Sequence, residues 1–241
     1  MSDILKNFDN FLDEIVMARK QDGVLSVHVI GSVLTPDFKP GRSDINSVVV
    51  VSDINLKLLD FFVSLGKKHK ASGVAAPVLM TPEYITSSLD VFPIEFLNFR
   101  EIHQTMFGDD VLAALQINPE HLRLQCEREV KSKLLWLHQG YISALGDRSF
   151  LVRRLLDSIT GFFPVLRAIL FLGDREMPQT CHDIVTALHD FIGLDADVFE
   201  TVFQLKNRDQ DKIPDENELA DCFTRYYEAT KRLVEHVDAQ A

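Results

Sequence analysis

The chain has 241 residues, of which 46% are hydrophobic and 25% charged, and it carries a formal net charge of −11. These values are typical of a folded protein with one large domain or two small ones, and they exclude a disordered chain. The acidity argues against a nucleic-acid partner, because phosphate backbones are held mainly by lysine and arginine. The acidity is compatible with binding of a single nucleotide and of a small, cationic acceptor molecule.

Composition along the chain also limits its environment. The longest apolar region, Leu151 to Leu172, is interrupted by three arginines, an aspartate and a proline. It therefore favours a buried bundle helix over a membrane span. The acidic, amphipathic N-terminus is not typical of a signal peptide, so we expect a cytoplasmic protein without a membrane partner. Three distant cysteines, and eight histidines without a His-x-x-x-His spacing or a shared cluster, indicate neither disulfides nor a histidine metal site.

The first part of the chain, up to about Phe99, alternates helix and strand patterns. Apolar residues at helical spacing predict a helix from Ser2 to Gly23. The elements predicted after it are a strand over Val24–Ile30, a loop over Gly31–Arg42, a strand over Ile45–Val51, a helix over Leu56–Lys70, a strand over Val74–Met80, a helix over Pro82–Leu89 and a strand over Phe92–Phe99. This order predicts an α+β (α/β) domain, a small mixed β-sheet with helices packed on it.

The second part of the chain reads as helical throughout. Two long apolar stripes cover Leu122–Leu145 and Leu151–Leu170, and Pro164 is expected to kink the second. Shorter helices are predicted over Asp183–Ile192 and Asp197–Leu205, followed by a loop over Asn207–Asn217 and a closing helix over Glu218–Val237. The sequence therefore predicts two domains, residues 1–110 and 119–241, the second an all-helical bundle of four or five helices.

The stretch GSVLTPDFKPGRSDIN, from Gly31 to Asn46, carries the clearest chemistry. A glycine directly after a strand lets the backbone approach a ligand closely, and Ser32 offers a hydroxyl and an amide to a phosphate oxygen. Asp44 and Asn46 flank an apolar residue at the start of the next strand, so their side chains should point the same way. Two parallel oxygen ligands are suited to a magnesium ion that also holds a triphosphate.

A third carboxylate is expected from a neighbouring strand. The strand predicted over Phe92–Phe99 contains one charged residue, Glu95, inside an apolar run. A carboxylate in that position is costly unless it meets a metal or a cation. Glu95 is therefore either a third metal ligand or the partner of a buried arginine.

This combination of motifs resembles the polymerase-β-like nucleotidyltransferase superfamily. Its signature is a Gly-Ser after a strand, then Asp-x-Asp with an apolar middle residue, then a carboxylate on a later strand. Within the superfamily, the stretch from Gly31 to Asn46 is most similar to the aminoglycoside adenylyltransferases that modify streptomycin and spectinomycin. The helical second half also resembles the bundle of those enzymes. The chain departs from the pattern at Asn46, where the family has its second aspartate.

The resemblance implies a reaction and a set of roles. A hydroxyl of a small acceptor would attack the α-phosphate of ATP or another nucleoside triphosphate, and pyrophosphate would leave. Glu95 would be the general base, acting beside Asp44. The nucleotide would be bound by Gly31, Ser32, Lys39, Arg42 and Ser43, and Mg²⁺ by Asp44, Asn46 and Glu95.

Asn46 leaves two outcomes open. An asparagine offers a metal its carbonyl oxygen without a charge, which weakens a site for a hard cation. The protein is then either a slow nucleotidyltransferase or a catalytically silent nucleotide-binding or regulatory protein on the same fold. A third possibility, one half of a toxin–antitoxin pair, is disfavoured by the large covalent helical half.

Overall fold

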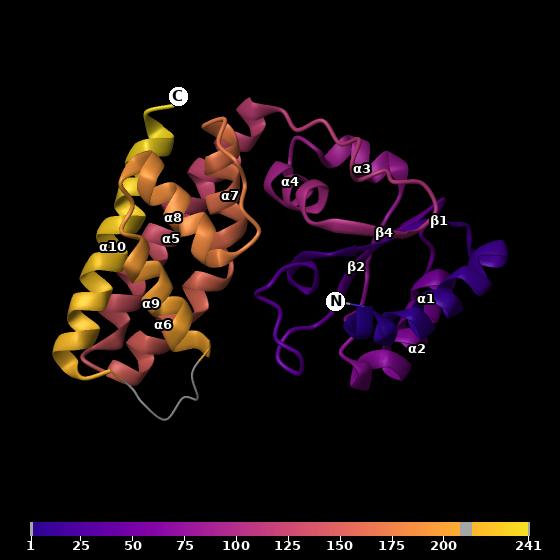
Figure 1. The fold of residues 1–241 in the computed structure, drawn as a ribbon, viewed down its shortest axis with the longest axis horizontal. Coiled ribbons are helices and arrows are strands. Elements are labelled where there is room, and N and C mark those ends of the chain that lie inside the picture. The colour runs from indigo at the N-terminus through magenta and orange to yellow at the C-terminus, as the bar shows by residue number, and fades with distance from the viewer. Residues whose placement is uncertain (1, 208–213, 241) are drawn as a thin grey trace. The chain divides into compact units, whose positions relative to one another are not determined.

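The computed structural model describes residues 2–207 and 214–240. Contacts between residues divide the chain into two compact units, Met1–Asn118 and Pro119–Ala241. The first unit is built on a sheet, and the second is formed by helices (Figure 1).

The sheet of the first unit has four described strands in the order β3-β2-β1-β4. They are β1 (Val24–Ile30), β2 (Asn46–Val51), β3 (Val78–Met80) and β4 (His103–Phe107). β1 pairs antiparallel with both β2 and β4, and β3 pairs parallel with β2. The sheet is therefore mixed, as the sequence predicts.

Helices cover both faces of this sheet. They are α1 (Ser2–Asp22), α2 (Leu56–His69), α3 (Pro82–Ser88) and α4 (Pro93–Glu101), with short 3₁₀ turns at Gly31–Leu34 and Lys70–Ser72. Figure 1 shows α1 and α2 below the sheet and α3 and α4 above it. Buried residues of α1 and α2 form one core with alternate strand residues such as Val27, Val29 and Val49. Burying these apolar side chains is the main favourable contribution to the fold of this unit.

The strand predicted over Phe92–Phe99 is wrong, because this segment is helix α4. Pro93 stands at the first helical position, where its missing N–H costs no bond. Ile94 and Leu97 are buried three residues apart on one side of the helix, whereas Glu95 is exposed. The strand that completes the sheet, β4, comes after α4, in a segment for which no element is predicted from the sequence.

β3 is shorter than the strand predicted over Val74–Met80. Only Val78–Met80 pairs continuously with β2, and Val74 forms an isolated bridge with Ile45. Pro77 lies between them and has no N–H to donate, so a continuous ladder cannot pass through it.

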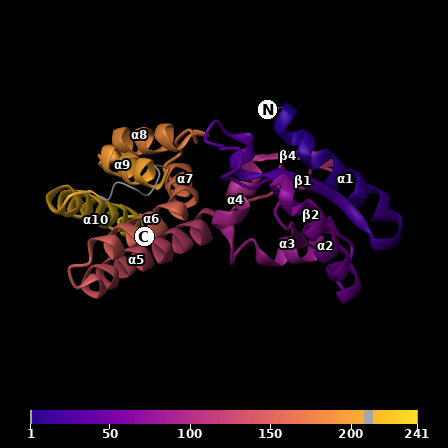
Figure 2. The ribbon, with the colours of Figure 1, turned by 90° about the horizontal axis from the view of Figure 1, so that it is seen from below.

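The second unit contains six helices among the described residues, more than the four or five expected. They are α5 (Pro119–Ala144), α6 (Arg148–Thr160), α7 (Phe162–Leu172), α8 (Cys181–Ile192), α9 (Ala196–Asn207) and α10 (Glu216–Asp238). Figure 2 shows them from a second direction. The loop expected over Asn207–Asn217 falls mostly outside the described residues, and α10 starts after Asp215, which forms a capping box with Glu218.

The extra helix arises because the stripe over Leu151–Leu170 is two helices rather than one kinked helix. α6 and α7 meet at Gly161 with a bend of 44°. Pro164 does not cause this break. It lies in the first turn of α7, where proline is tolerated because the N–H groups of that turn have no partner within the helix.

Among the described residues, no single helix has both the length and the hydropathy of a membrane span. The bent pair formed by Arg148–Ile159 and Phe162–Leu172 meets these two criteria when its halves are taken together.

Gly108 provides a test of the packing at the end of β4. Its φ is +76°, and an added Cβ would collide with the carbonyl oxygen of Leu25 and with Ser26. The change Gly108→Ala should lower the free energy of unfolding by about 2–4 kcal/mol, because left-handed strain adds to a backbone clash. Urea denaturation measures this loss.

Gly41→Ala is the matched control for that change. Gly41 has a φ of +79° but no atom within 4 Å of an added Cβ. The free energy of unfolding of the Gly41→Ala variant should fall by only about 1 kcal/mol, because backbone strain is the only penalty. Equal losses in the two variants would show that the contact with Leu25 does not constrain the fold.

Candidate functional site

The candidate nucleotide segment, Gly31–Asn46, begins where β1 ends. Gly31 has a φ of +77° and its amide donates to the carbonyl oxygen of Ile102 at 3.1 Å. The next turn is closed by Thr35, whose amide and hydroxyl both donate to the carbonyl oxygen of Ser32, at 2.9 and 3.0 Å. The Ser32 side chain itself is exposed. The turn therefore holds a serine hydroxyl at the protein surface directly after the strand.

The rest of the segment forms a second turn. The amides of Arg42 and Ser43 donate to the carbonyl oxygen of Lys39, at 3.1 and 2.9 Å. Lys39 and Ser43 are half-buried, and Arg42 is exposed. Two cationic residues and a second hydroxyl therefore lie within one turn, immediately before Asp44.

Asp44 and Asn46 lie on either side of a buried residue. Both are exposed, whereas Ile45 between them is 2% exposed and packs in the core. The Asn46 amide nitrogen donates a long hydrogen bond of 3.5 Å to the backbone carbonyl of Asp44. A carboxylate and an amide thus point outward at the edge where β2 begins.

The structure does not supply the third strand carboxylate that the sequence analysis expected. β1 and β3 flank β2, and neither contains an aspartate or glutamate. Glu95 projects from an exposed position of α4. The prediction that Glu95 reaches Asp44 from an adjacent strand is therefore wrong, and its role as general base stays a prediction.

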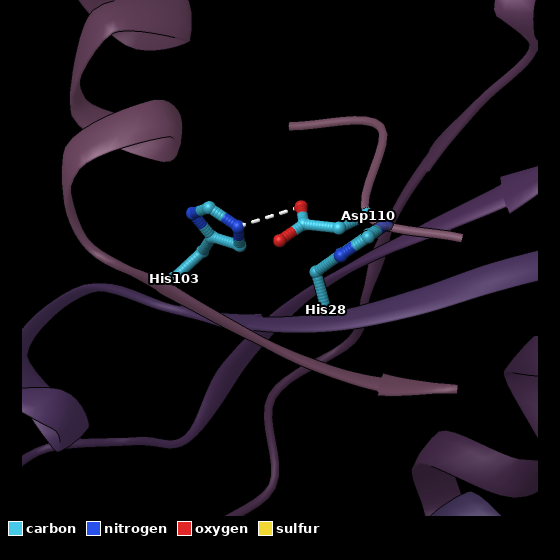
Figure 3. A group of neighbouring side chains, drawn as sticks. All are labelled: His28, His103 and Asp110. Carbon is cyan, nitrogen blue, oxygen red and sulfur yellow. Dashed lines mark hydrogen bonds and ion pairs between the residues drawn. The ribbon is translucent and has the colours of Figure 1, made fainter. Parts of the chain in front are cut away.

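A second polar group lies on the same face of the sheet. Ile30 of β1 is paired with Asn46 on one side and with His103 on the other. His28, two residues before Ile30, therefore shares this face. His28, His103 and Asp110 form one cluster, and each offers a ligating atom within 4.8 Å of the others (Figure 3).

Sequence reasoning missed this cluster and assigned no histidine to a metal site. The three residues are far apart in the sequence and come together only because β4 pairs with β1 and the chain then turns back. One signal was present in the sequence, since His28 and Ser26 are the polar residues of a strand that is otherwise apolar.

His28 is fully buried and uses both ring nitrogens. Its Nδ1 lies 2.9 Å from the Thr105 hydroxyl, and its Nε2 lies 2.8 Å from the Ser26 hydroxyl. Thr105 also bonds the Asp110 carboxylate, which only accepts, so the Thr105 hydroxyl donates there and accepts from His28 Nδ1. Ser26 then donates to Nε2. Burial is the main cause that lowers the pKa of His28 to about 4; neighbouring His103 also lowers this pKa, and Asp110 opposes the shift.

His103 and Asp110 are held against each other. His103 Nδ1 donates to the carbonyl oxygen of Arg100 at 3.0 Å, and its Nε2 lies 2.8 Å from Asp110 Oδ1. The amide of Ala113 donates to the same carboxylate oxygen at 3.1 Å. Burial alone would raise the pKa of Asp110, but Ala113, His103 and Thr105 together hold that pKa below its ordinary value.

Comparison with known proteins agrees with this architecture. No protein-family model matches the sequence, and no curated protein matches it either. Among solved structures, the chain is similar to the spectinomycin adenyltransferase AAD(9) from Enterococcus faecialis, crystallised with ATP and spectinomycin. The TM-score is 0.55 at 12% identity, and the match covers 93% of this chain and 97% of the other. The chain therefore has the nucleotidyltransferase fold, a small mixed sheet followed by a helical domain.

Thr105 gives a test of the hydrogen bonds around His28. The change Thr105→Val keeps the shape of the side chain but leaves the buried His28 Nδ1–H without its acceptor. We expect the free energy of unfolding to fall by about 1–3 kcal/mol, measured by denaturant titration in EDTA. Gln104→Val changes the exposed neighbouring residue of the same strand and should alter stability by less than about 0.5 kcal/mol. A Thr105→Val protein as stable as the control would contradict this hydrogen-bond assignment.

Proposed function

We propose that this protein binds a nucleoside triphosphate with Mg²⁺ at Gly31–Asn46 and slowly transfers its nucleoside monophosphate to a hydroxyl of a small molecule. The observation that carries the proposal is the outward projection of Asp44 and Asn46 beside two turns that together carry two serine hydroxyls and two cations. Further support comes from the fold and from the ATP and spectinomycin bound to the similar adenyltransferase.

The donor set fits a magnesium ion that arrives with a nucleotide. Mg²⁺ prefers oxygen ligands and is often held by one or two carboxylates together with substrate phosphates. Asp44 provides one carboxylate and Asn46 a neutral carbonyl oxygen. Without the charge of a second aspartate the two residues attract the ion less strongly. The phosphates of the nucleotide are then a necessary part of the site.

The remaining residues have binding and proton-transfer roles in this proposal. Gly31 lets the backbone approach the triphosphate, and the hydroxyls of Ser32 and Ser43 bond its oxygens. Lys39 and Arg42 supply positive charge from the same turn. Mg²⁺, when bound, neutralises phosphate charge as it develops in the reaction.

The reaction itself is a displacement at phosphorus. The acceptor oxygen forms a bond to the α-phosphorus, the bond to the pyrophosphate oxygen breaks, and the hydroxyl proton passes to a base. We keep Glu95 in the role of that base, because it is the carboxylate to which the sequence motif pointed. Glu95 is exposed on α4, where its carboxylate is accessible to an acceptor from solvent.

A second candidate function is silent nucleotide binding. It is favoured by the lack of any aspartate or glutamate in β1 and β3, the strands beside β2. In that case the nucleotide serves as a ligand that stabilises or regulates the protein, and no transfer follows.

Asp44→Ala tests nucleotide binding. We expect Mg-ATP affinity to fall at least tenfold, because the carboxylate of the proposed metal site is lost, as measured by isothermal titration calorimetry. The control is Asp60→Ala, which removes another exposed acid, from α2. Unchanged Mg-ATP affinity in Asp44→Ala, or an equal loss in Asp60→Ala, would overturn the proposed binding site.

Asn46→Asp separates slow transfer from silent binding. The added charge should strengthen the Mg²⁺ site and raise the rate of pyrophosphate release over a panel of hydroxylated acceptors by about tenfold or more. If neither the natural protein nor this variant releases pyrophosphate above background, silent binding is the better description. Glu95→Gln in the Asn46→Asp background should abolish the gain, and an unchanged rate would remove Glu95 from the mechanism.

A further inference from the structure

The cluster of His28, His103 and Asp110 has the composition of a metal site. Two imidazoles and a carboxylate come from three different segments, β1, β4 and the turn after β4 (Figure 3). Their ligating atoms all lie within 4.8 Å of one another. Four-coordinate zinc holds its ligand atoms about 3.3 Å apart, so modest side-chain rotations bring these three into range.

The close contact between His103 and Asp110 requires a positively charged species, a proton or a metal ion, between the two side chains. His103 Nδ1 faces the carbonyl oxygen of Arg100, which can only accept, so Nδ1 carries a proton. Its Nε2 faces the Asp110 carboxylate at 2.8 Å, and an unprotonated nitrogen there would place two lone pairs against each other. Either a second proton or a metal ion must lie between these atoms.

The surroundings of the two imidazoles are those of metal ligands. A ligating histidine almost always donates its other ring N–H to an oxygen, which fixes the tautomer and the orientation of the ring. The Arg100 carbonyl does this for His103. For His28, metal binding requires the other tautomer, in which Nε2–H donates to the Ser26 hydroxyl 2.8 Å away and Nδ1 gives up its proton. His28 Nδ1, now bonded to Thr105, and His103 Nε2 then both face the cluster.

A metal ion can reach the cluster from solvent, and one of its four coordination positions would remain free of protein ligands. The His103 side chain is 9% exposed, and that of Asp110 is 45% exposed, so the carboxylate lies at the mouth of the cluster. Three protein ligands leave a fourth position for water or for the Thr105 hydroxyl. Two nitrogens and one carboxylate favour zinc and similar transition metals over magnesium, which prefers oxygen.

We propose that His28, His103 and Asp110 form a binding site for a divalent transition metal of the zinc class, separate from the Mg-nucleotide segment. The bound ion links β1, the edge strand β4 and the turn at Asp110. Because the ligands converge only in the folded chain, binding stabilises the native state by mass action.

The test uses the full-length protein stripped with EDTA and titrated with Co²⁺, whose visible absorption reports a site with nitrogen and oxygen ligands. We expect one saturable equivalent that Zn²⁺ displaces, and a rise in the thermal midpoint on adding Zn²⁺. His103→Gln and Asp110→Asn should each weaken Co²⁺ binding at least tenfold.

Two control variants locate the effect. His182→Gln removes an exposed histidine of α8 that pairs with Glu200, and it should bind Co²⁺ like the natural protein. Asp44→Ala should also bind Co²⁺ normally, which separates this site from the nucleotide segment. If circular dichroism shows that His103→Gln does not fold, the Co²⁺ affinity of Asp110→Asn alone tests the proposal. The Asp110 side chain is partly exposed, so this variant is expected to fold.

Three results would overturn the proposal. The first is the absence of stoichiometric Co²⁺ binding to the folded natural protein. The second is an unchanged affinity in the folded His103→Gln and Asp110→Asn variants. The third is an equal loss of affinity in His182→Gln, which would indicate non-specific binding to surface histidines.

Discussion

The register of β1 between β2 and β4 is the constraint on which the arrangement of both candidate sites depends. Ile30 pairs with Asn46 on one side and with His103 on the other, so these residues share one face of the sheet. A shift of one residue in either ladder would reverse the faces. The buried valines of the opposite face pack against α1 and α2 and prevent such a shift, because it would bring these valines to the face that carries polar residues.

The sequence predicted the parts of the fold that local pattern determines. β1 was predicted with its observed bounds, and the outward orientation of Asp44 and Asn46 followed from strand alternation. Both depend on neighbours within a few residues. α4 was mistaken for a strand because a short apolar run does not distinguish a buried strand from a buried helix. β4, with the sequence HQTMF, has little β-branched character and is held in the sheet by pairing with β1.

The histidine cluster could not be predicted for a related reason. His28 and His103 are 75 positions apart, and His103 and Asp110 are seven apart. These separations match no known metal-binding sequence motif. Only the antiparallel pairing of β4 with β1 and the close approach of Gly108 to Leu25 bring them together. Long-range pairing of this kind depends on the whole unit. The candidate segment Gly31–Asn46 could be singled out from the sequence because its residues lie in one continuous stretch.

The order of strands has a consequence for the behaviour of the protein at high concentration. β3 and β4 are the outer strands, and an outer strand with unsatisfied N–H and C=O groups invites intermolecular pairing and aggregation. β3 is three residues long and is preceded by Pro77, which cannot donate to an incoming chain. β4 spans five residues and its pairing with β1 shifts between Val27 and His28. Both edge strands are therefore too short or too irregular to pair with a strand of another molecule and start an intermolecular sheet.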